Sequence, residues 1–358
     1  MRYVKAENLT NGMILGRPFL GDYGRLLLRK GAALNDTTIG LIKRLKYSGL
    51  YIIDEYSDGV EPNFIISDEL RNNTVQALHQ LMMNINMSAD SAIPTSVNKV
   101  KDLVNTIVTD IINVDSAVIN IIDLKSYDLY TYQHSVNVSV FAGVLGLSMG
   151  MNKTEIHNLV TAAMFHDIGK ILIPKEVLNK PADLDDEEFE VIKKHPELGA
   201  KYLKDNLNMD ATIYIPVRQH HEFHDGSGYA EGLVENQITL FARIIAIADV
   251  YDAITSNRVY HKAFAPHEAC EYIMGNAGRH FHPDCVNHFV KTVAPYPVGI
   301  TVLLSNGDEG IVVRNNTNFP MRPVIKIKPE PNKPYVFAKY VDLCHDPDML
   351  DVVIAGIA

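Results

Sequence analysis

Two adjacent ionisable residues, His166 and Asp167, stand in the otherwise apolar segment MFHDIGKILIP, and Lys170 follows three residues later. Burying such groups costs free energy unless they pair with an opposite charge or bind a metal ion. An imidazole beside a carboxylate in this setting is typical of a metal-binding or catalytic site. Other parts of the chain would then have to supply the remaining groups.

Further histidines and an aspartate occupy comparable contexts in separate segments. They are His134 in YTYQHSVNV, His195 in IKKHPELG, His220 and His221 in HHEFHDGSGYA, and Asp249 in IIAIADVYDA. Asp249 is the most informative of them, because a carboxylate among isoleucines on a buried helix is costly unless it is compensated. A salt bridge to an arginine in the core would explain Asp249 if it is considered alone.

Taken together, these seven side chains are the imidazole and carboxylate ligands that transition metals bind. Thiolates take no part, since the only cysteines, Cys270, Cys285 and Cys344, are far apart and form no CxxC pattern. Seven ligands are too many for one tetrahedral ion but suit two ions that share a carboxylate, and iron, manganese or zinc would fit. Neighbours on a helix point about 100° apart, so His166 and Asp167 approach an ion from two sides, which suits Asp167 as the bridge.

Helical periodicity dominates residues 66–294, which must position these side chains. We expect one helix after the capping residue Ser67, another in VNKVKDLVNTIVTDIINV, and a third opened by His134. Asp185, with a glutamate three residues later, predicts the start of a helix that His195 ends. TLFARIIAIADVYDAITS is apolar on almost every side and predicts a central buried helix.

The flanking regions have a different pattern. Residues 1–65 predict short strands with one helix and a closing strand in YIIDEY, and lack the acidic phospho-acceptor pattern of a receiver domain. Residues 295–358 alternate with period two, and Asn306-Gly307 marks a hairpin turn. The expected fold class is therefore mainly α, with a helical domain between a small N-terminal α+β domain and a small C-terminal β domain. The C-terminal domain would serve either as a partner-binding barrel or as a structural cap.

Composition sets the protein class. The 358 residues are 47% apolar and 21% charged, which suits two or three globular domains. The net charge of −10 excludes a broad basic nucleic-acid surface and leaves room only for a local basic pocket. The first residues contain no long apolar stretch, and no uncharged run of 18 apolar residues follows, so we expect a cytoplasmic protein without membrane insertion.

The ordered motifs resemble those of the HD-GYP family, a branch of the HD phosphohydrolases. HDIGKILIPKEVLNKP, IKKHPELG, HHEFHDGSGYA and ARIIAIADVYDAITSNRVY are similar to the successive family motifs over roughly residues 125–290. The resemblance implies an all-helical domain that hydrolyses cyclic di-GMP, a bacterial second messenger, to linear pGpG and often on to GMP. The first 60 residues also resemble a small N-terminal domain often fused to such enzymes.

The resemblance also implies roles for individual residues. One ion would be held by His134, His166, Asp167 and Asp249, and a second by His195, His220 and His221 with Asp167 shared. Lys170 would lie near the scissile phosphate, and the ligand-binding positions would be Gly228, Tyr229, Arg258 and His261. Two ions about 3.5 to 4 Å apart can hold a hydroxide between them and clamp a phosphodiester. The Tyr229 ring could stack on guanine, or it could be a partly buried loop aromatic.

Three positions depart from the family pattern. The signature Gly-Tyr-Pro is here Gly228-Tyr229-Ala230, and alanine leaves the loop less rigid, which bears on partner docking. His261 replaces a basic residue and would grip a phosphate less firmly. Some members hold a third metal with a glutamate where this chain has Tyr130, so we predict two ions.

The predicted function is a metal-dependent cyclic di-GMP phosphodiesterase in which a metal-bridging hydroxide attacks the phosphodiester. One alternative is a nucleotide sensor that hydrolyses little and signals through its flanking domains. Another is an HD hydrolase of a different nucleotide. The sequence leaves open which metal binds, the final product, homodimer formation, and whether a protein partner docks through residues 228–230 or the terminal domains.

Overall fold

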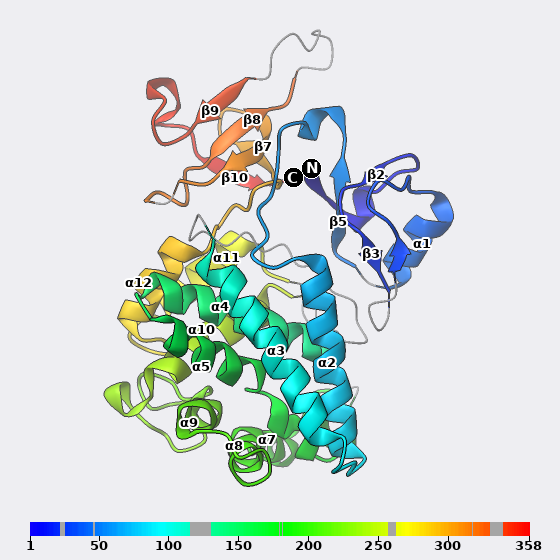
Figure 1. Cartoon of the computed structure of the whole chain (residues 1–358). Coiled ribbons are helices and arrows are strands. Elements are labelled where there is room, and N and C mark those ends of the chain that lie inside the picture. The colour runs from blue at the N-terminus through cyan, green and yellow to red at the C-terminus, as the bar shows by residue number, and fades with distance from the viewer. Residues whose placement is uncertain are drawn as a thin grey trace.

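The computed structural model describes residues 1–21, 26–45, 47–114, 130–178, 180, 182–256, 263–316, 318–329 and 339–358. The middle of the chain forms a large helical part, drawn at the bottom of Figure 1, and the strands form small sheets near the two ends of the chain. The protein is thus mainly α, as the sequence predicts. Over the described ranges, no helix combines the length and the apolar character that crossing a bilayer would need.

The N-terminal region is a small α+β unit. Its three-stranded antiparallel sheet has the order β1 (Arg2–Lys5), β5 (Gly49–Ile53), β2 (Ile14–Leu15), beside a hairpin of β3 (Phe19–Leu20) and β4 (Leu26–Leu28) and the helix α1 (Asp36–Arg44). Short 3-10 helices occur at Ala6–Asn8 (η1) and Glu55–Ser57 (η3). The strand predicted at the start of YIIDEY is confirmed as part of β5. It comes last among the strands of this region in the sequence but is central in its sheet, because it pairs with both β1 and β2.

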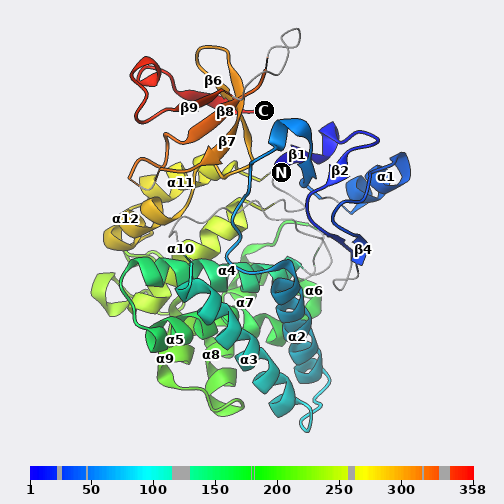
Figure 2. The ribbon, with the colours of Figure 1, turned by 45° about the horizontal axis from the view of Figure 1, so that its top comes forward.

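The central part contains helices α2 to α12 and has its own hydrophobic core. The helices are α2 (Asp68–Asn86), α3 (Ile93–Ile112), α4 (Tyr130–Ser148), α5 (Lys153–Met164), α6 (Lys175–Leu178), α7 (Asp186–Ile192), α8 (His195–Asp205), α9 (Ala211–Gln219), α10 (Leu240–Ile254), α11 (Pro266–Gly275) and α12 (Pro283–Thr292), with 3-10 helices η4 (Ile168–Leu172) and η5 (Glu235–Gln237). As predicted, α10 is central: it packs against α4, α9, α11 and α12. Figures 1 and 2 show α10 beside α4, α11 and α12.

Local sequence signals explain where several helices begin. Ser67 caps α2 by accepting from the Leu70 amide, and Asp185 caps α7 by accepting from the Glu188 amide, both as predicted. The predicted limits around His195 are wrong: α7 stops at Ile192, and His195 begins α8 instead of ending a helix. Pro196 explains this break, because proline lacks the N–H that a continuing helix needs but suits a first helical turn.

The predicted start of the helix at His134 is also wrong, for α4 already includes Tyr130 and places His134 one turn inside. An interior position fixes the direction of the His134 side chain more firmly than a frayed first turn would. This matters for the site described below.

The C-terminal region is a five-stranded antiparallel sheet with a separate core. The strand order is β10 (Ile354–Ile357), β6 (Thr301–Leu304), β7 (Glu309–Arg314), β8 (Val324–Ile327), β9 (Tyr340–Asp342), and η6 spans Pro347–Met349. The predicted hairpin joins β6 and β7, with Gly307 in its turn at a φ of 90°.

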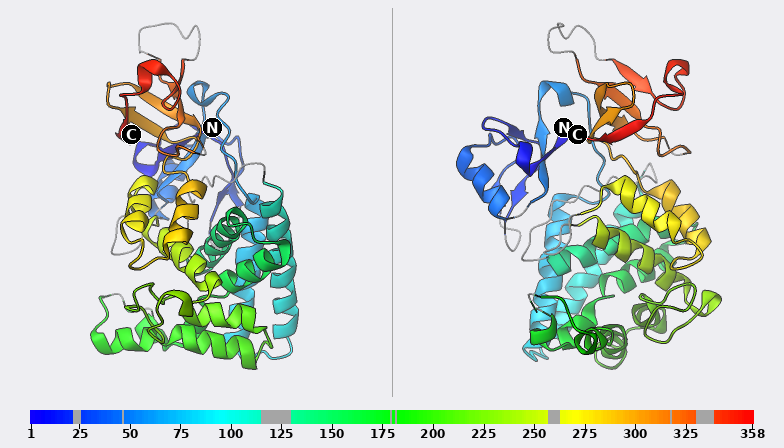
Figure 3. Two further views of the ribbon diagram at one scale, coloured as in Figure 1. Left: turned by 90° about the vertical axis from the view of Figure 1, so that its left-hand side faces the viewer. Right: turned by 180° about the vertical axis from the view of Figure 1, so that it is seen from behind.

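The two terminal regions lie on the same side of the helical part in the views of Figures 1 and 3. They are in direct contact, because the Tyr3 amide donates to the Gly299 carbonyl at 2.8 Å and the buried Lys326 ammonium donates to the Asp58 carbonyl at 2.8 Å. Val60, from the connection to the helical part, packs into the C-terminal core. The terminal sheets therefore support each other.

Candidate metal centre

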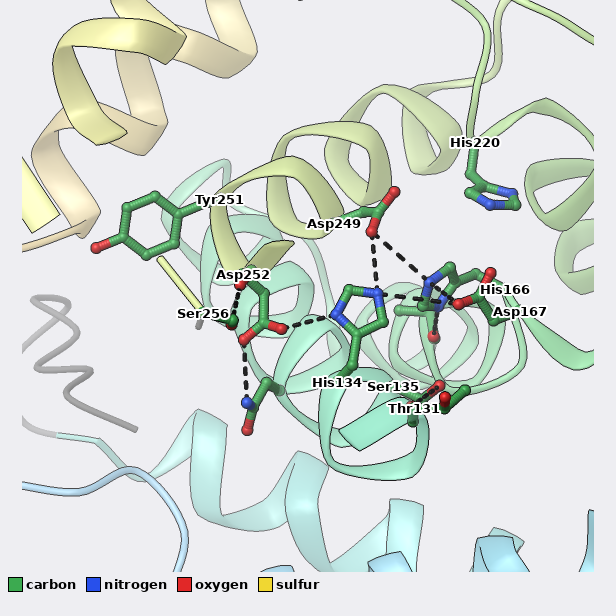
Figure 4. Close-up of polar contacts among 12 residues, drawn as sticks. Thr131, His134, Ser135, His166, Asp167, His220, Asp249, Tyr251, Asp252 and Ser256 are labelled. Atoms are coloured by element: carbon green, nitrogen blue, oxygen red, sulfur yellow. Dashed lines mark hydrogen bonds and ion pairs between the residues drawn. The ribbon is translucent and has the colours of Figure 1, made fainter. Parts of the chain in front are cut away.

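The structure brings all seven predicted metal ligands into one cluster inside the helical part. Three sets of side chains have candidate ligand atoms within 4.8 Å of one another: His195, His220 and His221; His134, His166 and Asp167; His166, His220 and Asp249. His166 and His220 each occur in two sets, so the sets join into one centre. Figure 4 shows five of these residues converging from α4, α10 and the loops that follow α5 and α9.

Three of the histidines are oriented by the same local device. His166, His195 and His220 each follow the end of a helix, where carbonyl groups lack intrahelical partners. The Nδ1 atom of each ring donates to the carbonyl three residues earlier: Ala163 at 2.7 Å, Ile192 at 2.8 Å and Val217 at 2.7 Å. A carbonyl can only accept, so each neutral ring carries its lone pair on Nε2. The Nε2 atom is then the one that can bind a metal.

His134 lies between two carboxylates of α10 (Figure 4). Its Nε2 is 3.0 Å from Asp249 Oδ1 and its Nδ1 is 2.7 Å from Asp252 Oδ2, while Asn137 donates to Asp252 Oδ1 at 3.0 Å. Burial alone would lower the pKa of His134, but the hydrogen bonds to Asp249 and Asp252 outweigh it and raise the pKa to about 10. Asp252 thus holds the Nδ1 side of the His134 ring, while Nε2 on the other side faces Asp249.

Asp252 was missed by the sequence reasoning. The signal was present, because Asp252 follows Asp249 by three residues on an apolar helix, and residues so spaced share a helix face. It is 1% exposed, so its charge needs the partners that His134 and Asn137 provide.

Asp167 lies between the two halves of the cluster. Its Oδ1 is 3.3 Å from His195 Nε2, and its Oδ2 is 3.5 Å from His166 Nε2 and 3.9 Å from His134 Nε2. Lys170 donates to the same Oδ2 at 2.7 Å. Burial would raise the pKa of Asp167, but the Lys170 charge and the neighbouring histidines hold it well below its usual range. This carboxylate is charged and faces both sets of imidazoles.

The polar atoms at the centre fit a divalent metal ion. Within the described part of the chain, His166 Nε2 and Asp167 Oδ1 are buried without a hydrogen-bond partner. His195 Nε2 and His220 Nε2 lie only 3.4 Å apart, and both carry lone pairs because both Nδ1 atoms donate elsewhere. Burial and the adjacent His221 push the pKa of His220 well below its usual value, so a proton on His220 does not relieve this repulsion. A cation among these atoms relieves it, and the nitrogen and oxygen donors suit a transition metal.

Two glycines bring His195 close to Asp167. A Cβ on Gly169 would lie 1.9 Å from the His195 carbonyl oxygen and 2.6 Å from the Gly199 nitrogen. The backbones approach so closely at Gly169 and Gly199 that no side chain fits between them, so η4 and α8 cross backbone to backbone at this point. The HDIGK segment therefore needs Gly169, because only glycine lets α8, which begins at His195, lie against the segment that carries Asp167.

The loop that follows His221 packs directly against the cluster. A Cβ on Gly228 would lie 2.4 Å from the His221 carbonyl oxygen, and the Tyr229 amide donates to that oxygen at 3.0 Å. The Tyr229 ring stacks on the His221 ring with 4.7 Å between centroids and 30° between planes. One face of Tyr229 thus supports a candidate ligand, and the Tyr229–Ala230 peptide bond is cis.

Buried Glu222 holds this loop and was also missed by the sequence reasoning. Its carboxylate accepts from the Glu231 amide at 2.5 Å and from the Leu233 amide at 3.0 Å. The sequence places Glu222 beside two histidines but does not show that its partners lie nine and eleven residues later.

Some predicted positions lie outside the described residues. These are Arg258 and His261, together with the side chain of Tyr130. Their predicted roles stay predictions.

Comparisons with known proteins match the helical part of the chain. A sequence model described as HD domain matches residues 116–285. A cyclic di-GMP phosphodiesterase of Pseudomonas aeruginosa is 38% identical over 226 residues, which cover 63% of this chain and 54% of that protein. A cyclic di-GMP phosphodiesterase response regulator of Xanthomonas campestris is 40% identical over 156 residues, or 43% of this chain and 41% of the relative.

A third relative differs in its named substrate. The 3'3'-cGAMP-specific phosphodiesterase 2 of Vibrio cholerae is 31% identical over 196 residues, covering 54% of this chain and 34% of that protein. The chain spans about half the length, or less, of the curated relatives it matches. The HD, HHE and DGSGY motifs lie within the matched residues 116–285, in the segments that follow α5 and α9, so this region of the chain is similar to HD domain proteins, among them proteins named as cyclic di-GMP phosphodiesterases.

Proposed function

We propose that this protein is a metal-dependent phosphodiesterase that hydrolyses cyclic di-GMP to pGpG, with GMP as a further product. The observation that carries the proposal is the single buried cluster of five histidines and two aspartates with Asp167 between its halves. Two relatives named as cyclic di-GMP phosphodiesterases align with this region and support the substrate.

Two divalent ions, iron or manganese with zinc as an alternative, are part of the proposal. His134, His166 and Asp249 would hold one, His195, His220 and His221 the other, and Asp167 both. His166, His220 and Asp249 also lie within mutual reach, so this division between the ions belongs to the proposal. When bound, such ions supply Lewis acidity toward a phosphodiester and lower the pKa of water.

Lys170 is placed to act on the substrate. Its side chain is 30% exposed at the edge of the cluster, while its ammonium group lies on Asp167 Oδ2. A lysine on a flexible stem can donate both to this carboxylate and to a phosphoryl oxygen beside it. We propose that Lys170 stabilises the negative charge that develops on the phosphate.

Replacing Lys170 with methionine is expected to lower kcat by about 10²- to 10³-fold, because a donor aimed at developing charge is lost. Metal content is expected to persist, since all seven candidate ligands remain. Lys180→Met is the matched control, for Lys180 is 29% exposed and pairs with Glu188 away from the cluster. Steady-state rates with elemental analysis check both variants, and an unchanged kcat in Lys170→Met would contradict the role.

Metal binding is expected to release about one proton from His134 near pH 8. Without metal, Asp249 and Asp252 raise the pKa of His134 to about 10, so its ring stays protonated up to that pH. A metal ion needs the Nε2 lone pair and must displace this proton. Titration calorimetry with Mn²⁺ in two buffers of different ionisation enthalpy measures the released proton, and buffer-independent heats would argue against this geometry.

The substrate itself is tested by product analysis. The Mn²⁺-loaded protein is incubated with cyclic di-GMP or with 3'3'-cGAMP, the substrate in the name of one relative, and the mixtures are separated by chromatography. We expect pGpG from cyclic di-GMP at the higher rate. Intact cyclic di-GMP bound tightly to the protein would favour a sensor, and faster loss of 3'3'-cGAMP would reassign the substrate.

A further inference from the structure

A line of buried and partly buried polar contacts runs from His134 across three helices. Asp252 of α10 accepts from His134 Nδ1 at 2.7 Å and from Asn137 Nδ2 of α4 at 3.0 Å. The oxygen of the Asn137 amide accepts in turn from the guanidinium of Arg71, on the second turn of α2. The first two contacts join α4 to α10 and the third joins α4 to α2, so the position of His134 depends on how α2, α4 and α10 are packed.

The first turn of α2 is also tied to the N-terminal region. Arg17 donates to both oxygens of Asp68, with Nε 3.1 Å from Oδ2, and its guanidinium lies 3.8 Å from the centroid of the Phe64 ring. Arg17 is 9% exposed and the Asp68 side chain 29% exposed, so this ion pair is partly desolvated. Asp68 precedes Arg71 by three residues, which places both on one face of α2.

We propose that Arg71, Asn137 and Asp252 are positioning residues for the metal centre, and that the Arg17–Asp68 pair links them to the N-terminal region. Asp252 holds the His134 ring with its Nε2 atom toward the cluster, and Asn137 and Arg71 hold Asp252. Groups that orient a metal-binding histidine change metal affinity although they do not touch the ion. The inference rests on the proposed metal centre but not on the identity of the substrate.

The amide of Asn137 is the decisive member. It is 1% exposed and donates to a carboxylate that is equally buried, so its removal leaves Asp252 Oδ1 without this donor. A buried carboxylate that has lost one of its donors shifts toward its remaining partners or takes up water, and the His134 ring turns with it. The expected consequence is weaker metal binding without the loss of any ligand.

Titration calorimetry of Mn²⁺ into the metal-free protein of residues 1–358 tests the positioning role. Asn137→Ala is expected to raise the Kd for Mn²⁺ by about 10- to 100-fold, and Arg71→Met by a smaller factor that Arg71→Lys restores. Asn84→Ala is the matched control, because Asn84 is another buried amide, bonded to Ser96 Oγ at 2.8 Å between α2 and α3. Its Kd is expected to match that of the wild type.

The link to the N-terminal region is tested with a second pair of variants. Arg17→Met is expected to raise the Kd for Mn²⁺ several-fold, whereas Arg2→Met, which breaks the Arg2–Asp54 pair of 2.8 Å inside the N-terminal region, is expected to leave it unchanged. An unchanged Kd in Arg17→Met overturns the link.

The remaining outcomes are also distinct. A wild-type protein that binds no Mn²⁺ overturns the proposed metal centre itself. Tight wild-type binding with an unchanged Kd in folded Asn137→Ala overturns the positioning role. If circular dichroism shows Asn137→Ala to be unfolded, the partly exposed Arg71→Met variant decides in the same way.

Discussion

Asp167→Asn is expected to lower the turnover of cyclic di-GMP by on the order of 10³-fold and to deplete bound metal. The substitution keeps the shape of the side chain but removes the charge that faces His195 on one side and His166 on the other. It also leaves the Lys170 ammonium beside a neutral amide. Steady-state kinetics and elemental analysis of the purified variant measure the two effects.

The control for this substitution is Asp185→Asn. Asp185 is an exposed cap of α7, where asparagine also caps well, so neither turnover nor metal content is expected to change. Wild-type turnover in Asp167→Asn would show that the central carboxylate is not needed for hydrolysis.

Gly169→Ala is expected to remove metal from the His195 side of the centre and to reduce turnover by at least about 10²-fold. The added Cβ would lie 1.9 Å from the His195 carbonyl oxygen, so the backbone of α8 must move away. Such crowding typically costs about 1 to 3 kcal/mol of stability. Elemental analysis, steady-state rates and thermal unfolding measure the three consequences.

Gly275→Ala serves as the matched control because a Cβ at this position, at the end of α11, meets nothing within 4 Å. It is expected to behave as the wild type in all three measurements. Should Gly169→Ala keep the full metal content and rate, the close crossing of η4 and α8 would not be what positions His195.

The candidate ligands could be predicted from the sequence because each carries its own signal. A charged residue such as Asp249 in IIAIADVYDA is conspicuous where apolar periodicity predicts burial, and the central helix follows from the same stretch. Caps such as Ser67 and Asp185 depend only on residues within one turn. Local rules therefore sufficed to predict that these helices exist, but not the limits of the helices that carry His134 and His195.

The rest depends on partners far away in the chain. Asp252 carries a local signal like that of Asp249, but its role becomes clear only beside His134, 118 residues earlier, and the role of Glu222 only beside amides across a folded loop. The central place of β5 follows from its pairing with β1 and β2, which no property of YIIDEY specifies. The helical pattern continues through His195, so predicting that α8 begins there required recognising that Pro196 suits a first helical turn and not the interior of a helix.

Anomalous diffraction from crystals of the Mn²⁺-soaked protein tests the central claim most directly. The proposal predicts one anomalous peak among His134, His166 and Asp249 and a second among His195, His220 and His221, with the Asp167 carboxylate between them. An absence of peaks among these residues at saturating Mn²⁺, or a peak with Asp167 turned away from it, would contradict a carboxylate-bridged metal centre.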